Sequence, residues 1–477
     1  MSISHQPGTS ATSGHVSQGS AVGIFGVRDT NVSSSRVRSV RRGASPSERT
    51  GGRGAPARGA ERPALGKLRI AEHPQVTASD RRDSRLWLRK TLWEISTLDR
   101  AKGCGCRRQG ATSDVPVRWT ENVHAGLAGL QSCGSVWVCP VCAAKVAAHR
   151  SEEVGGALKT HLDQGKSIVF VTLTVRHHRG QALSEVWDVV SKAWAAVHRT
   201  AAWRGSRKVE GDKARFGIRG WVRAVEVTHG DAGWHVHTHV AVLVNRELTS
   251  DERDTLGARM FDRWSRACVR GGFEAPTEAH GVDVRQVSPG AGAAQAIGRY
   301  LVKTGLDGLA GEITGGAAKA ARGGNRALFQ VLADIKAAKD GGADCEGDLR
   351  IWREWEAGSH GRRQISWSGG LRDDLRLGEE LSDREIAEEE KDGYLVGAIP
   401  SEHWKKARID IAMRCQLFRE VERAKTPEQA ATAVRVVLTE HGYAAVDMAV
   451  QKIETSSPPT REQKRVDSER QARVLLR

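Results

Sequence analysis

The sequence predicts an α+β protein, with a central antiparallel sheet, helices on one face of it, a cysteine-rich segment before it and a helical region after it. Three observations support this class. A continuous apolar and β-branched run at 167–175 is typical of a buried strand. Two more apolar runs, 221–228 and 234–244, flank a Gly/Asp turn and indicate a hairpin. Helical spacing recurs between these strands, which favours a layered arrangement.

The N-terminal 80 residues are rich in Ser, Gly and Arg and have little periodic apolar content. Too little apolar surface is available there to offset ordering entropy, so we expect disorder. The whole 477-residue chain has a net charge of +16, which favours an anionic partner, either nucleic acid or an acidic membrane. The basic arm is interpreted equally well as a non-specific DNA-contacting arm or as a linker.

Helical spacing predicts helices at 83–100, 143–161, 183–199, 248–270 and 291–304, with a short strand at 282–287. Residues 305–345 are rich in Gly and Ala, and further helices are expected beyond 376. The expected organisation is a disordered basic arm, a helix with the cysteine-rich segment, the catalytic-type core, a Gly-rich loop with a Trp-rich extension, and a charged helical tail. The disordered arm is expected at 1–80, the helix with the cysteine-rich segment at 81–150 and the core at 151–310. The Gly-rich loop with its Trp-rich extension is expected at 311–375, and the charged helical tail at 376–477.

Five of the eight cysteines lie between 104 and 142, and two of them form the knuckle Cys139-Pro140-Val141-Cys142. Such a turn aims two thiolates at one ion, and tetrahedral zinc needs four ligands at about 2.3 Å. A structural zinc site is therefore expected, with buried free thiols as the alternative. A cytosolic chain of this size argues against a disulfide framework.

His237 and His239 are separated by one residue in a predicted strand. Strand side chains alternate, so both imidazoles point to the same side. Neutral imidazole is a common metal ligand, and the pair could hold one divalent ion. The alternative is a surface strand that happens to be rich in histidine.

Tyr300 is one of only three tyrosines, and Lys303 follows it by three positions in a predicted helix, on the same helical face. A cation next to a phenol favours the phenolate and can hold a phosphate oxygen, which suits a nucleophile. The alternative is a core aromatic beside a lysine whose ammonium reaches the solvent.

The order of these motifs, a Thr-rich strand, a His-x-His strand and a Tyr-x-x-Lys helix, resembles the HUH endonuclease superfamily. Within it the chain is similar to the rolling-circle replication initiators of Gram-positive and actinomycete plasmids, over about residues 100–375. Two positions depart from that pattern. Thr238 occupies a site that is usually bulky and apolar, and Ala296 stands where some initiators carry a glutamate that ends the replication round.

This resemblance implies an RRM-like core and a transesterification in single-stranded DNA. Tyr300 would attack the scissile phosphate, leaving a 5′-phosphotyrosine and a free 3′-OH that primes synthesis, and the strand would later be rejoined. His237 and His239 would hold Mn²⁺ or Mg²⁺, and Lys303 would position the phosphate or lower the tyrosine pKa. The same resemblance selects four zinc ligands, with Cys106 as the spare thiol: Cys104, Cys133, Cys139 and Cys142.

Glu226 is the expected third metal ligand, and His235 is the alternative. Directly opposed residues of a hairpin share a face. Glu226 therefore joins the two histidines only if even-numbered residues pair with odd ones, which a four- or six-residue loop or a bulge provides and a five-residue loop does not.

The expected partner is single-stranded or hairpin origin DNA, contacted by Arg176, Arg299 and Lys303. A host helicase, a polymerase and a second copy of the chain are further expected partners. No apolar run is long enough to span a membrane and no signal peptide is recognised, so a cytoplasmic protein without membrane contact is expected.

Three other functions remain open at this point. The chain could be a conjugative relaxase or transposase of the same superfamily, although the tyrosine follows the histidine pair and no Gly-x-x-x-x-Gly-Lys-[Ser/Thr] helicase motif occurs. It could be a zinc-containing DNA-binding regulator without catalysis. It could also be a metallohydrolase, for which no second set of carboxylates is evident.

Overall fold

The computed structural model describes residues 76–109, 114–122, 124–287, 292–302, 325–389, 392–446 and 448–453. Residues 1–75 of the predicted N-terminal arm and residues 305–324 of the Gly-rich segment lie outside these residues. Among the described helices, none is both long and apolar enough to cross a membrane.

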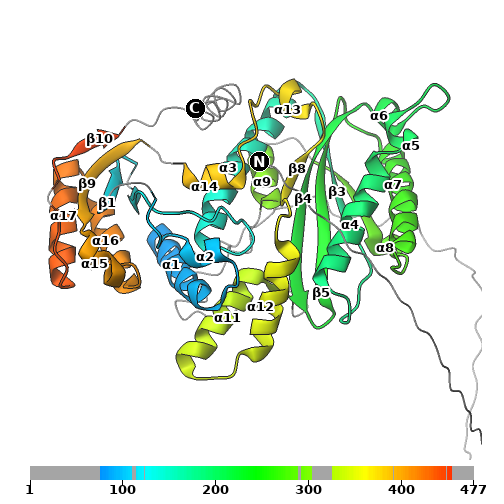
Figure 1. Cartoon of the computed structure of the whole chain (residues 1–477). Helices are drawn as coiled ribbons and strands as arrows, with labels where there is room; N and C mark the ends of the chain where they lie inside the picture. Colours follow the sequence, from blue (N-terminus) through cyan, green and yellow to red (C-terminus); the bar gives the residue numbers. More distant parts are fainter. Residues whose placement is uncertain are drawn as a thin grey trace, which may run out of the picture. The chain divides into compact units, whose positions relative to one another are not determined.

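A six-stranded antiparallel sheet forms the larger of two sheets, with strand order β6-β3-β5-β4-β7 and β8 paired to β4. The long β4–β5 hairpin and β3 are the three strands predicted from apolar runs (Figure 1). The strand bounds are β3 Ser167–Thr174, β4 Ile218–Gly230, β5 Gly233–Val244, β6 Val282–Gln286, β7 Arg326–Ala327 and β8 Ile365–Trp367.

Helices cover both faces of this sheet. The α4 helix (Leu183–His198) and the α7 helix (Ser250–Arg270) pack on the face that carries Val169 and Val171. The α3 helix (Pro140–Asp163) and the α9 helix (Ala293–Leu301) pack together on the opposite face. The predicted α+β class with a central antiparallel sheet is confirmed, and the structure adds a second helical layer to the one that was expected.

A second, four-stranded antiparallel sheet has the order β10-β9-β1-β2. It joins β1 (Val115–Thr120) and β2 (His124–Leu127) to β9 (Gly393–Ile399) and β10 (Gln451–Ile453). Its core includes helices α15 (Ser401–Ala407), α16 (Ile411–Arg423) and α17 (Pro427–Glu440), so the expected C-terminal helices are confirmed. The sequence analysis did not predict these four strands, because each short segment depends on a partner far away in the chain.

Remaining elements connect and support the two sheets. The α1 helix begins with a capping box, in which Thr77 and Asp80 satisfy each other's backbone N–H groups. The other bounds are α1 Ala78–Ile95, α2 Asp99–Gly103, α5 Ala201–Arg204, α6 Asp212–Arg215, α8 Glu278–Gly281, α11 Leu328–Gly341, α12 Glu346–Ser359, α13 Leu371–Asp374 and α14 Asp383–Glu388.

Candidate functional site

The β4–β5 turn decides which side chains share a face with the histidine pair. Gly230 pairs with Gly233, so only two residues form the turn. Gly233 has a φ of +84°, which favours glycine. An even-length turn pairs even with odd residues, and Glu226 therefore lies directly opposite His237. The condition set by the sequence for Glu226 is met.

Glu226, His237 and His239 form a compact donor set on the face of the sheet that α9 covers. Glu226 Oε2 is 3.2 Å from His237 Nε2 and 3.3 Å from His239 Nε2. One ligand atom from each residue lies within 4.8 Å of the other two. A carboxylate and two imidazoles at this spacing can hold a divalent ion and leave positions open for a substrate.

Thr172 orients one member of the set. It pairs with His239 across β3 and β5, and its Oγ1 is 3.1 Å from His239 Nδ1. When Nδ1 donates to this hydroxyl, the lone pair of Nε2 faces Glu226, which is the tautomer that a metal needs. The sequence showed Thr172 in the buried strand, but its link to His239 depends on strand register.

Tyr300 reaches the same place from α9. Its hydroxyl is 3.5 Å from His239 Nε2, and its ring makes an edge-to-face contact with Phe170. Burial raises the pKa of Tyr300 above its ordinary value, and the negative charge of Glu226 raises it further. A cation between these groups would act in the opposite direction and favour the phenolate.

His235, the alternative third ligand, is not part of this donor set. Its Nδ1 is 2.9 Å from His177 Nε2 instead. Burial lowers the pKa of His235 to about 4, so the ring is neutral at neutral pH. The geometry therefore favours Glu226 over His235.

The residues predicted to contact DNA lie outside the Glu226-His237-His239 group. Arg299 is exposed on α9 beside Tyr300, and Arg176 forms an exposed ion pair with Glu274, 2.8 Å apart. Lys303 lies outside the described residues. Ala296 lies on α9 one turn before Tyr300, so no carboxylate occupies that position.

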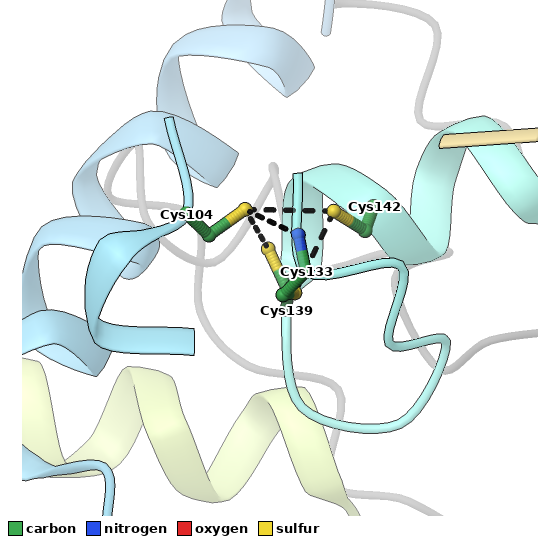
Figure 2. Close-up of side chains that lie close together, drawn as sticks. All are labelled: Cys104, Cys133, Cys139 and Cys142. Atoms are coloured by element: carbon green, nitrogen blue, oxygen red, sulfur yellow. Dashed lines mark hydrogen bonds between the residues drawn. The ribbon is translucent and has the colours of Figure 1, made fainter. Parts of the chain in front are cut away.

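Four cysteines form a second cluster (Figure 2). Cys104 Sγ is 3.6 Å from Cys139 Sγ and 3.5 Å from Cys142 Sγ, and Cys133 Sγ is 3.7 Å from Cys142 Sγ. A tetrahedron with zinc–sulfur bonds of about 2.3 Å has edges of about 3.8 Å, so the spacing fits one closed zinc site. Cys106 is not a member of the cluster.

The surroundings shift the pKa values of Cys104 and Cys139 in opposite directions. Burial raises the pKa of Cys139 well above its ordinary value, whereas hydrogen bonds from Cys133 and other thiols lower the pKa of Cys104. Four thiolates so close together repel one another, and a bound cation would remove that cost. The donor set thus fits the structural zinc that the sequence analysis expected.

The fold and the donor set together define a class: an α+β protein whose antiparallel sheet presents a Glu-His-His group to a tyrosine on a packed helix. The replication protein family model matches residues 126–407, which is more than half of the chain. The chain belongs to this family, and its resemblance to actinomycete rolling-circle replication proteins is confirmed.

Two curated relatives come from Streptomyces. A "Protein rep" of Streptomyces lividans is 31% identical over 314 residues, covering 56% of this chain and 68% of the relative. A "Neomycin resistance protein" of Streptomyces cyanogenus is 33% identical over 199 residues, covering 34% of this chain and 44% of that protein. No solved structure matches the chain.

Proposed function

We propose that this protein initiates rolling-circle replication of a plasmid by nicking one DNA strand at the origin. The observation that carries this proposal is the Tyr300 hydroxyl, which lies 3.5 Å from Nε2 of His239, a member of the Glu226-His237-His239 group. Membership of the replication protein family and the name of the Streptomyces lividans relative support the biological setting.

Each residue has a distinct part in the proposed reaction. Tyr300 Oη gives up its proton and forms a bond to phosphorus, and the bond from phosphorus to the 3′-oxygen breaks. That oxygen takes up a proton and leaves as a free 3′-OH, so the step needs no net proton. The phosphotyrosine retains the ester, so the strand can be rejoined by the reverse attack. Phe170 packs against the tyrosine ring and fixes the direction of its hydroxyl.

Glu226, His237 and His239 would hold the divalent ion, and Thr172 would keep His239 in the required tautomer. When bound, the ion polarises the scissile phosphate and stabilises the charge that develops there. Mixed nitrogen and carboxylate ligands suit Mn²⁺ better than Mg²⁺, which prefers oxygen.

The remaining roles are also proposals. Arg176, Arg299 and Lys303 contact the phosphates of single-stranded or hairpin origin DNA, and a host helicase and polymerase extend the 3′-OH. The four-cysteine zinc site has no open position, so its part is to support the fold and not to catalyse.

The test is a cleavage assay on a labelled single-stranded origin oligonucleotide with Mn²⁺. We expect a covalent protein–DNA adduct with the native chain and none with Tyr300→Phe. Tyr394→Phe and Tyr443→Phe are the matched controls and should still form it. Adduct formation by Tyr300→Phe, or origin binding by the native chain without any cleavage, would overturn the proposal; the second result favours a non-catalytic regulator.

A further inference from the structure

The turn at Cys104–Cys106 is held from two sides by tryptophans from opposite ends of the described chain. Trp93 of α1 donates from Nε1 to the Cys104 carbonyl at 3.0 Å, and Trp404 of α15 donates to the Cys106 carbonyl at 2.8 Å. The two carbonyls that accept these bonds lie on either side of Gly105. The turn is therefore fixed by long-range contacts as well as by the cysteines.

Two guanidinium groups accompany these tryptophans and converge on Gly105. Arg89 lies over the Trp93 ring at 5.5 Å from its centroid, and Arg414 Nη1 donates to the Gly105 carbonyl at 3.3 Å. A Cβ atom at Gly105 would be only 2.6 Å from Arg89 Cζ. The two cations thus approach the same residue, which directly follows the predicted zinc ligand Cys104.

Both arginines are buried, at 5% exposure for Arg89 and 2% for Arg414. Burial lowers the pKa of Arg414 to about 9, which reflects the cost of placing a cation there. Within the part of the chain that the structure describes, neither forms an ion pair with a carboxylate. An uncompensated buried charge is strongly destabilising, so an anion is required nearby.

Other buried arginines of this chain show the usual solution. Arg150 is 4% exposed and pairs with Glu153 at 3.0 Å, and Arg263 is 7% exposed and pairs with Asp212 at 2.5 Å. Arg89 and Arg414 differ because the groups of opposite charge that act on them are thiols: Cys104 for Arg89, and Cys106, Cys415 and Cys104 for Arg414.

We propose that Arg89 and Arg414 are the counter-charges of a zinc tetrathiolate formed by the four cysteines. Four thiolates and one Zn²⁺ carry a net charge of −2, which two guanidinium groups neutralise. This inference rests on zinc being bound there and goes beyond the nicking reaction. Zinc would then add to the direct contacts between α1 and α16, such as the ion pair of Arg419 with Asp83 at 2.6 Å, because its loss would leave two buried cations without an anion.

The test measures zinc affinity in the full-length chain by competition with a colorimetric chelator. We expect Arg89→Met and Arg414→Met to bind zinc about 10- to 100-fold more weakly, the usual cost of losing an outer-shell partner. Arg89→Lys and Arg414→Lys, which keep the charge, should recover much of that affinity. Arg150→Met is the control: it should lower stability and leave zinc affinity unchanged.

Unchanged zinc affinity in the folded methionine variants would overturn the proposal and leave packing as the role of both arginines. If those variants do not fold, Arg89→Gln, which lacks the charge, is compared with Arg89→Lys, which keeps it. Equal rates of zinc release from these two variants would overturn the proposal. A native chain without stoichiometric zinc would overturn it as well. The covalent-adduct assay is independent of this result, so failure of the zinc inference and failure of the nicking proposal are distinguishable.

Discussion

Glu226 lies directly opposite His237 across the β4–β5 hairpin, with Oε2 3.2 Å from Nε2. A directly opposed pair on one face is the closest arrangement that two strands offer. The two-residue turn at Asp231 and Ala232 sets this register, and it turns a histidine pair into a three-residue donor set.

Removing the carboxylate should therefore weaken metal binding. Loss of a residue that only supports a metal ligand typically weakens metal binding 10- to 100-fold. Glu226 is a proposed direct ligand, so we expect Glu226→Ala to lower Mn²⁺ affinity by at least that factor. Isothermal titration with Mn²⁺ measures this. His235→Ala serves as the comparison and should have a smaller effect; a larger effect for His235→Ala would make His235 the third ligand.

Thr172 should matter through His239. Thr172→Val keeps the shape of the side chain but removes the oxygen that is 3.1 Å from His239 Nδ1. We expect Mn²⁺ affinity and the rate of adduct formation to fall about 10- to 100-fold, as for other outer-shell partners. Thr174→Val, on the same face of β3, is the matched control, and equal losses in both variants would refute a specific role for Thr172.

The four-cysteine cluster should depend on Cys104 and not on Cys106. Cys104→Ser is expected to abolish stoichiometric zinc in metal analysis and to lower the unfolding temperature by roughly 5 °C or more, since each kcal/mol shifts it by about 2–4 °C in chains of 150–250 residues. Cys106→Ser should retain zinc, because Cys106 lies outside the cluster. Zinc loss from Cys106→Ser alone would reverse the assignment.

His198 should make stability depend on pH. Burial lowers its folded-state pKa to about 4, while the unfolded value is near 6.5. Between these values the unfolded state binds more protons at this residue, so the contribution of His198 to the free energy of unfolding falls as the pH drops from about 6.5 towards 4 and is constant above. Urea unfolding across this range should show a shallower decline for His198→Gln than for the native chain. Parallel curves would show that His198 does not titrate in this way.

The sequence alone determined the features that depend on local periodicity. The alternation of a strand places His237 and His239 on one side, and helical spacing places Tyr300 on a helix. The cysteine knuckle at Cys139 and Cys142 is also local. These predictions required only neighbouring residues, whose side-chain directions follow from the backbone geometry.

Tertiary structure alone decided how these parts meet. The two-residue turn placed Glu226 on the same face as His237 and His239, and strand register placed Thr172 beside His239. The β9 strand pairs with β1, which lies far from it in the sequence. Arg89 and Arg414 likewise approach Gly105 only because distant segments of the chain pack together. Such contacts join residues far apart in sequence, and no local pattern encodes them because they depend on how whole elements pack.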